Sequence, residues 1–214
     1  MKKQINSSSF TTILILVCSA ALQACAPMVV GGFVGGTMVV TDRRTSGAQL
    51  EDEGIEIKGS SRIKESLNGK VHVNLSSYNR QVLITGEAFN ERDAKYVSEI
   101  ISQVDNVRSV LNEVQVANFS TFSERSQDVL IQSKVKASLV DSKDIFASAF
   151  KVHAERGVIY LMGRVTQKEA DRAVEVARNV SGVQKVVKVF EIITEAELKG
   201  LLPTPGKTPA PNSK

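Results

Sequence analysis

The sequence of 214 residues has no tryptophan, only two cysteines and five prolines, and an aromatic content of 5%. This composition favours small α+β units with ordinary cores. The formal net charge of +4 is too modest to indicate a nucleic-acid-binding protein. No apolar run reaches the roughly 20 residues that a transmembrane helix needs. A nucleic-acid binder and a membrane-spanning protein are therefore both disfavoured at the outset.

The N-terminus has the features of a targeting segment. Two lysines precede an uncharged apolar stretch at residues 10–21, which is typical of a signal peptide. The stretch closes at Leu22-Gln23-Ala24-Cys25, which resembles the lipobox of bacterial lipoproteins. The resemblance implies that residues 1–24 are removed and that Cys25 becomes the acylated first residue, and Ala26 after it implies sorting to the outer membrane. An ordinary signal peptide or an uncleaved anchor is the alternative.

The lipobox also determines what the cysteines can do. Cys18 lies within the predicted signal peptide and would leave with it, while Cys25 would carry lipid. The mature chain would then have no cysteine pair, which excludes a disulfide framework and a thiol catalyst. Several acyl chains on Cys25 would anchor the protein stably, because each buried CH₂ contributes about 0.8 kcal/mol.

Residues 25–47 are predicted to be a tether between the lipid and the folded part. Residues 28–40 are apolar and rich in glycine, and they are too short to span a bilayer. Their GxxxG spacings are a weak signal outside a full membrane helix. A flexible apolar tether near the lipid surface is the favoured interpretation, with residues 42–45 marking its exit into water.

The remaining sequence contains one unit twice, and an internal repeat constrains a fold strongly. An apolar run ending in glycine occurs as Val82-Leu83-Ile84-Thr85-Gly86 and again as Val158-Ile159-Tyr160-Leu161-Met162-Gly163. The repeat predicts domains at 48–117 and 124–193 with a linker at 118–123. The predicted disordered tail covers residues 194–214.

The periodicity predicts the same order of elements in both copies. Helices are expected at 50–67, 92–104, 126–140 and 167–180, and strands at 71–75, 81–86, 107–116, 149–154, 157–163 and 183–193. The acidic residues 51–53 suit the positive end of the first helix dipole. The predicted fold class is α+β, with two tandem units, each helix-strand-strand-helix-strand. In each unit two helices pack on a three-stranded mixed sheet.

These units resemble the BON domain. The resemblance rests on the element order, on the glycine that ends the second strand, on the polar turn after it, and on Asp105-Asn106-Val107 and Ser181-Gly182-Val183 before the last strand. Two such units behind a lipobox are similar to the dual-BON lipoproteins. The resemblance implies an outer-membrane protein facing the periplasm, which binds anionic phospholipid through its second domain, supports envelope integrity and has a link to the division site.

The charges of the two copies agree with that division of roles. Residues 48–117 hold 8 basic and 11 acidic residues, a net −3, whereas residues 124–193 hold 12 and 9, a net +3. Anionic headgroups attract lysine and arginine by roughly 1 kcal/mol each near the surface. The first helix of the second copy places Leu130 beside Lys134, which suits an interfacial contact. The predicted phospholipid-binding residues are Leu130, Ile131, Lys134, Val135, Lys136, Leu139 and Val140.

Two features of this helix leave alternatives open. Leu130 is also compatible with covering the linker or the other domain, because single exposed leucines are common. The predicted helix contains no aromatic residue, although aromatic side chains favour the membrane interface. A protein-interaction adaptor, with envelope proteins as partners and incidental lipid contact, is therefore the second hypothesis.

Residues for catalysis or metal binding are not grouped in recognisable motifs. His72 and His153 occupy equivalent positions in the two copies, but neither has metal ligands at suitable spacing. No Ser–His–Asp arrangement, phosphate loop or dinucleotide fingerprint stands out. Gly86 and Gly163 are interpreted as structural glycines that need a small residue near a strand end. We therefore expect no enzyme activity, cofactor, metal, small-molecule substrate or nucleic-acid partner.

Overall fold

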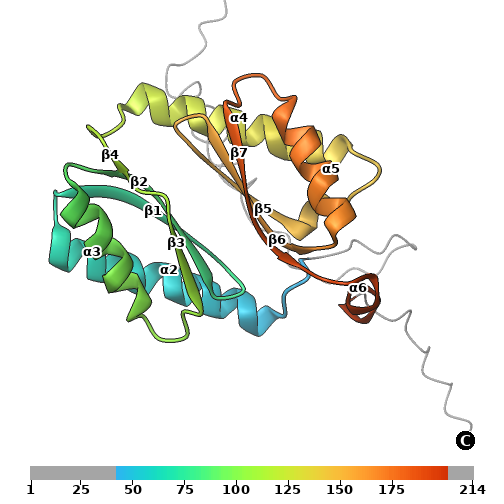
Figure 1. Ribbon diagram of the computed structural model, residues 1–214, viewed down its shortest axis with the longest axis horizontal. Helices are drawn as coiled ribbons and strands as arrows, with labels where there is room; N and C mark the ends of the chain where they lie inside the picture. The colour runs from blue at the N-terminus through green and yellow to red at the C-terminus, as the bar shows by residue number, and fades with distance from the viewer. Residues whose placement is uncertain (1–41, 202–214) are drawn as a thin grey trace, which may run out of the picture. The chain divides into compact units, whose positions relative to one another are not determined.

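The computed structural model describes residues 42–201, which form two domains of the same construction and a short final helix (Figure 1). The first domain consists of α2 (Ser46–Leu67), β1 (Val71–Tyr78), β2 (Gln81–Ala88), α3 (Glu91–Ser102), β3 (Ser109–Asn112) and β4 (Gln115–Val116). The second consists of α4 (Phe122–Asp141), the 3-10 helix η2 (Ala147–Ala149), β5 (Phe150–Glu155), β6 (Val158–Val165), α5 (Gln167–Arg178) and β7 (Lys185–Ile192). The predicted α+β fold with two tandem units is confirmed. The predicted signal peptide and Cys25 lie outside the described residues.

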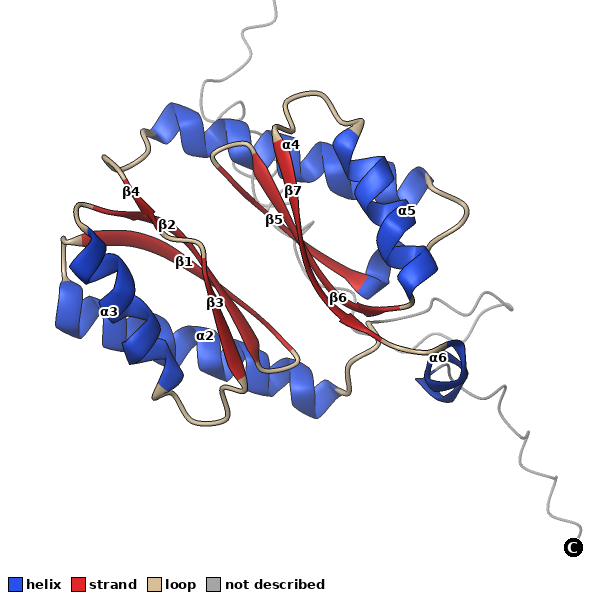
Figure 2. Cartoon of the chain, viewed as in Figure 1, coloured by secondary structure: helices blue, strands red, loops and turns tan. Residues whose placement is uncertain are grey.

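Each sheet has its longest apolar strand in the middle. In the first domain β2 pairs antiparallel with β1 and parallel with β3 and β4. In the second domain β6 pairs antiparallel with β5 and parallel with β7. Figure 2 shows that the two helices of each domain cover the outer face of its sheet.

The outer faces of the two sheets form separate cores with the helices. On β2, Val82 and Ile84 pack toward α2 and α3, and on β6, Ile159 and Leu161 pack toward α4 and α5. Side chains alternate between the two faces of a strand. The residues between these positions therefore point away from the helices and need another cover.

The inner faces of the two sheets cover each other. Their apolar side chains form a third cluster, which joins both domains: Tyr78, Leu83, Tyr160, Met162 and Val189, with Leu111, Val158 and Val187 partly buried against it. The central strands β2 and β6 are thus buried on both faces, which explains why each contains an unbroken apolar run, Val82–Ile84 and Val158–Met162, rather than an alternating pattern.

A buried aspartate on the first helix of each domain holds the β-hairpin of that domain. Asp52 of α2 accepts hydrogen bonds from the backbone N–H groups of Asn79 and Arg80, both at 2.8 Å. Asp128 of α4 accepts from the N–H groups of Arg156 and Gly157, also at 2.8 Å. These turns have positive φ angles, and a carboxylate that binds two adjacent N–H groups fixes such a turn.

The helices α2 and α4 begin four residues earlier than predicted. Thr45 caps α2 by accepting a hydrogen bond from the N–H of Ala48 at 3.1 Å, so the acidic residues 51–53 lie beyond the first turn. Thr121 and Glu124 form a reciprocal capping box at the start of α4. The prediction that residues 51–53 complement the dipole of the first helix was therefore wrong.

Both ends of the described chain are more ordered than predicted. The tail prediction was wrong for α6 (Glu195–Leu201), which is helical. The segment predicted to exit into water at residues 42–45 instead contains the buried Arg43. Its guanidinium donates to both carboxylate oxygens of Glu169 at 2.8 and 2.6 Å and to the carbonyl of Arg164 at 2.9 Å. This segment therefore packs against the second domain before the first domain begins.

Gly86 and Gly163 lie two residues before the ends of β2 and β6. A Cβ added at Gly86 would lie 2.1 Å from the carbonyl oxygen of His72, and its φ angle is +112°. A Cβ added at Gly163 would lie 2.4 Å from the carbonyl oxygen of Ala149. Each glycine allows the neighbouring backbone to approach more closely than a side chain would permit.

Candidate membrane-contact surface

The structure separates the predicted lipid-binding residues of α4 into two groups. Ile131, Val135 and Leu139 are at most 4% exposed and belong to the core of the second domain. A side chain in the core cannot reach a membrane while the domain is folded. Their assignment to the lipid-binding surface is therefore corrected: they position the helix rather than contact lipid.

The other predicted residues lie on the exposed side of α4. Leu130 is 62% exposed and Val140 is 70% exposed, and both lysines, Lys134 and Lys136, are exposed. Neither lysine has an ion-pair partner among residues 42–201. Their charges are available to an external anion.

Two further apolar residues on this side were missed from the sequence. Phe122, the first residue of α4, is 81% exposed, and Val129 is 64% exposed. The expectation that this helix lacks an aromatic residue was wrong because the helix starts earlier than its apolar period suggests. The Thr121–Glu124 capping box was the sequence signal that marks the true start. We call Phe122, Val129, Leu130, Lys134, Lys136 and Val140 the α4 surface.

The serines between these residues do not make the α4 surface strongly polar. The hydroxyl of Ser126 donates to the carbonyl of Phe122, and that of Ser133 donates to the carbonyl of Val129, both at 2.8 Å. A hydroxyl bonded back to its own helix has less need of water. The surface therefore combines apolar side chains with two unpaired ammonium groups.

The first domain does not repeat this surface. The buried pairs Asp52–Asp128 and Ile55–Ile131 align α2 with α4. In this alignment Glu53 and Gly54 of α2 replace the Val129 and Leu130 of α4. An acidic and a small residue at these positions would weaken contact with an anionic membrane, so the two domains differ at the positions where α4 is most apolar.

Both histidines lie among polar groups between the two sheets. His72 Nδ1 is 3.3 Å from Glu87, and His153 Nε2 is 2.8 Å from the hydroxyl of Thr85 and 3.6 Å from Glu155. Within residues 42–201 no group of three or more His, Cys, Asp or Glu side chains is arranged to hold a metal ion. The histidines therefore belong to the contact between the domains.

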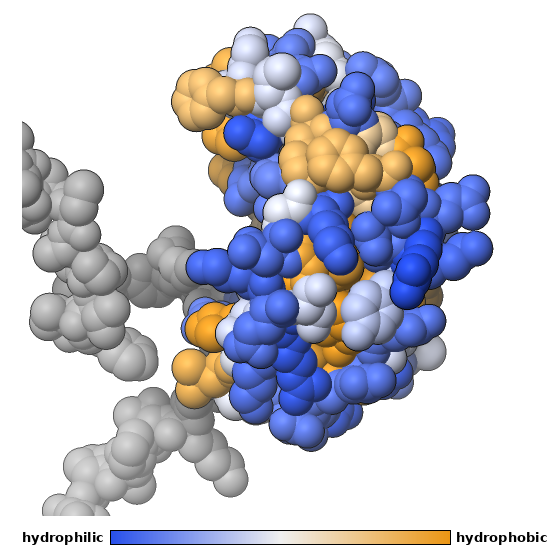
Figure 3. Space-filling model, turned by 90° about the vertical axis from the view of Figure 1, so that its left-hand side faces the viewer, coloured by the Kyte–Doolittle hydropathy of each residue, from blue (hydrophilic) through white to orange (hydrophobic). Residues whose placement is uncertain are grey.

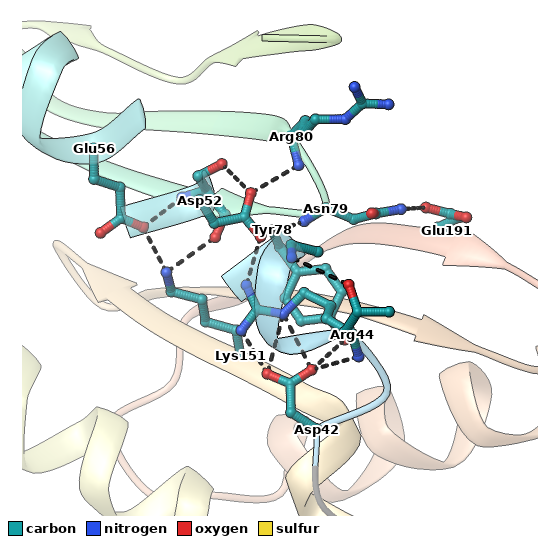
Figure 4. Close-up of polar contacts among 12 residues, drawn as sticks. Asp42, Arg44, Asp52, Glu56, Tyr78, Asn79, Arg80, Lys151 and Glu191 are labelled. Atoms are coloured by element: carbon teal, nitrogen blue, oxygen red, sulfur yellow. Dashed lines mark hydrogen bonds and ion pairs between the residues drawn. The ribbon is translucent and has the colours of Figure 1, made fainter. Parts of the chain in front are cut away.

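A polar cluster at the other end of this contact joins the domains through charges (Figure 4). Arg44 lies over the ring of Tyr78 at 4.2 Å and binds Asp52 at 2.6 Å. Lys151 of β5 reaches Glu56 of α2 at 2.6 Å. Burial first, and then the charge of Asp42, raises the pKa of Tyr78 to about 12, so this phenol stays neutral. Further ion pairs between the domains are Arg108–Glu191 and Arg156–Glu87.

Comparison with known families identifies both domains. The model of the BON domain matches residues 52–118 and 127–194. The chain belongs to the BON-domain family. The two matches coincide with the two sheet-and-helix units, so the packed pair is a pair of BON domains.

Individual relatives connect this BON pair with the bacterial envelope. The chain is 33% identical over 182 residues to the outer membrane lipoprotein DolP of Haemophilus influenzae, covering 84% of this chain and 94% of that protein. It is 29% identical over 154 residues to a 21 kDa hemolysin of Actinobacillus pleuropneumoniae, covering 71% of this chain and 79% of that one. A solved structure of CdsD from the type III secretion system of Chlamydia trachomatis aligns with 70% of this chain and 98% of its own, at 14% identity. Its TM-score of 0.29 is too low to argue from.

The relatives determine the location of the chain. It is an envelope-associated BON-domain lipoprotein of the outer membrane, held by lipid and facing the periplasm. None of the helices within the described range is long and apolar enough to cross a membrane. The family match and the relatives indicate an envelope protein rather than a known enzyme family.

Proposed function

We propose that this protein binds anionic phospholipid through the α4 surface of its second BON domain. The single observation that carries the proposal is the exposure of Leu130, Val129 and Phe122 beside Lys134 and Lys136 on one helix. Apolar side chains enter the acyl boundary of a bilayer while ammonium groups remain at the phosphates. The net charge of +3 on residues 124–193 favours the approach to an anionic surface.

The proposal includes an anchor and a cellular role. Acylated Cys25 holds the chain in the outer membrane, and binding of the second domain to anionic lipid supports the integrity of the envelope, including at the division site. We expect Cys25→Ala to release the protein from the outer-membrane fraction. Unchanged fractionation of that variant would show that something other than the acyl chains retains it.

A vesicle-binding experiment tests the proposal. The mature chain with Cys25→Ser should bind vesicles containing phosphatidylglycerol more tightly than vesicles of phosphatidylcholine, and the difference should shrink at high salt. Leu130→Glu should abolish binding, because it places a carboxylate among the phosphates. Replacing Lys134 or Lys136 with glutamine should weaken binding about fivefold each, since each contributes roughly 1 kcal/mol.

The first domain supplies a matched control. Ile57 of α2 is 71% exposed and lies in the equivalent helix. Ile57→Glu introduces the same charge at an equally exposed position, and we expect it to leave vesicle binding unchanged. Equal loss of binding in Ile57→Glu and Leu130→Glu, or binding of wild type to both vesicle types alike, would overturn the assignment to α4.

A further inference from the structure

We infer that a second membrane contact lies outside α4, at the stacked rings of Phe89 and Phe119, and that its occupant is the acyl–headgroup boundary of the same bilayer. This inference rests on the proposed function. Phe89 belongs to the first domain and Phe119 to the linker. The contact would therefore bring both parts of the chain, and not only the second domain, to the membrane.

The two rings form a defined apolar unit at the surface. Their centroids are 4.3 Å apart with an angle of 25° between the planes. Phe89 is nevertheless 55% exposed, and Val116, just before the linker, is 52% exposed. The ring of His72 lies 6.0 Å from Phe119 and closes one side of the pair. Phe119 is only partly exposed, so the ring of Phe89 supplies most of the apolar surface that this pair leaves for a partner.

The backbone holds this pair close to the start of α4. The N–H of Ala117 donates to the carbonyl of Ala88 at 3.1 Å, which fixes the linker beside the end of β2. Arg156 of the second domain donates to the carbonyl of Asn118 at 3.3 Å. Only two residues lie between Phe119 and Phe122, so their Cα atoms are at most about 11 Å apart. The pair is therefore continuous with the α4 surface.

Unpaired basic groups accompany the rings, as they do on α4. Val71 pairs with Ala88, and Lys70 and Phe89 are the next residues outward from this pair. Lys70 and Arg92 are exposed, and neither has an ion-pair partner in the part of the chain that the structure describes. The acidic neighbours are engaged locally, because Glu91 pairs with Lys95 at 3.6 Å and Asp93 accepts from the side chain of Asn90 at 2.8 Å. An exposed phenylalanine beside two unpaired basic groups suits the boundary between acyl chains and anionic headgroups.

Figure 3 views the side of the molecule on which β4 and the start of α4 lie. Apolar side chains reach the surface in the upper part of this view and are surrounded by hydrophilic ones. This distribution agrees with separate apolar contacts among polar groups, rather than with one extended apolar surface. A bilayer accepts such a pattern, because its headgroups bind the polar groups between the inserted rings.

The absence of tryptophan from the sequence makes a direct test simple. Phe89→Trp and Phe119→Trp, each in the mature chain with Cys25→Ser, give proteins with one tryptophan. On phosphatidylglycerol vesicles its emission should shift to the blue, and brominated acyl chains should quench it at least twofold. Ile57→Trp on α2 is the control, because Ile57 is 71% exposed but lies outside the pair and its basic neighbours; its emission should not change.

A binding measurement separates this inference from the proposed function. Phe89→Ser should weaken binding to phosphatidylglycerol vesicles by about tenfold while circular dichroism shows an intact fold. If Phe89→Ser binds like wild type and neither tryptophan responds to vesicles, the second contact is wrong, although Leu130→Glu still abolishes binding. If wild type itself does not bind, the proposed function fails together with this inference. If the tryptophan emission changes on addition of a soluble protein but not on addition of any vesicle, the inferred membrane contact is also overturned.

Discussion

Asp52 and Asp128 illustrate a role that the type of residue alone does not reveal. Both carboxylates are buried, and both bind two adjacent backbone N–H groups of a hairpin turn. In the sequence Asp52 lies among acidic neighbours and looks like part of a solvated helix start. Only the fold brings the turn, about 28 residues later, to the helix. A contact of this separation has no local signal, so the sequence could not predict it.

Loss of one of these carboxylates should destabilise its hairpin. We expect Asp128→Ala to lower the free energy of unfolding by about 2 kcal/mol, because the N–H groups of Arg156 and Gly157 lose their acceptor. Urea unfolding followed by circular dichroism measures the change. Asp141→Ala, at an exposed position in the last turn of the same helix, is the control and should change stability by less than about 0.5 kcal/mol. Equal effects would show that Asp128 does not hold the turn.

Asp52 and Glu169, whose pKa values are lowered in the folded protein, contribute to its response to acid. Burial alone would raise the pKa of Asp52, but hydrogen bonds from Ser77, Arg80 and Arg44 outweigh it and hold the pKa below its usual value. The pKa of Glu169 is lowered in the same way, with Arg43 as the main donor. A pKa that is lower in the folded state stabilises the fold above the unfolded value of about 4, and this stability is lost as the pH falls below it.

The expected result is a nearly constant free energy of unfolding from pH 7 to about pH 5.5 and a decline below about pH 5. Asp52→Asn should be less stable at pH 7 and should show a shallower decline, because one of the titrating groups is gone. Urea unfolding at several pH values between 3.5 and 7 measures both effects. A decline as steep as that of the wild type would mean that Asp52 is not a source of the acid sensitivity.

At the scale of elements, periodicity predicted what each strand and helix is, but not what covers it. The run Val158–Met162 is continuously apolar, which is typical of a strand buried on both faces. The helices of the unit account for only one face. The second face is covered by the other domain, through Tyr160 and Met162. The apolar pattern thus indicated that both faces of the strand are covered, but it did not identify the segment that covers the second face.

The helix α4 shows the same difference between what periodicity predicts and what it leaves open. Its apolar period at Ile131, Val135 and Leu139 identified a helix correctly, but these positions face the core. The exposed residues Phe122, Val129 and Lys136 also recur at a helical spacing, on another side of the helix, so periodicity alone did not show which side faces the core. Exposed apolar residues such as Val129 can be recognised only after the core residues have been assigned.

Two glycines of the same chain should respond oppositely to an added methyl group. Gly163→Ala should cost at least about 3 kcal/mol, because the new Cβ would overlap the backbone oxygen of Ala149 between paired strands. Gly54→Ala should stabilise the protein by about 1 kcal/mol, because no atom lies within 4 Å of the new Cβ and alanine favours helix over glycine. Thermal unfolding measures both, and a stabilised Gly163→Ala would contradict the close approach of β5 and β6.

At the scale of the whole described chain, the two BON domains contact each other through an apolar cluster and several charged pairs. The membrane contacts proposed for α4 and for Phe89 need this arrangement, because they lie on different parts of the chain. Neither the apolar pattern within one domain nor the sequence of the linker indicates that the two sheets face each other. The arrangement follows from surfaces that become complementary only after each domain has folded.

Substitutions in the ion pair between Arg43 and Glu169 test whether the segment before the first domain helps to hold the two domains together. The side chain of Arg43 is 1% exposed, and Glu169 is its carboxylate partner at 2.6 Å. Removing one member of a buried pair leaves the other charge unpaired, which typically costs about 3–5 kcal/mol. Arg43→Met should therefore lower the unfolding temperature of the second domain, to whose α5 Glu169 belongs, and should change the first domain less.

A second substitution shows whether the charge or the packing of Arg43 is responsible. Arg43→Met combined with Glu169→Gln removes both charges but keeps a side-chain acceptor for the N–H of Thr166, which Glu169 binds at 2.9 Å in the capping box of α5, and we expect it to recover most of the lost stability because no unpaired charge stays buried. Differential scanning calorimetry should show one transition for the wild type, two for Arg43→Met, and one again for the double variant. Two transitions in the double variant would mean that the geometry of the guanidinium, with its bond to the carbonyl of Arg164, holds the domains together rather than the balance of charge.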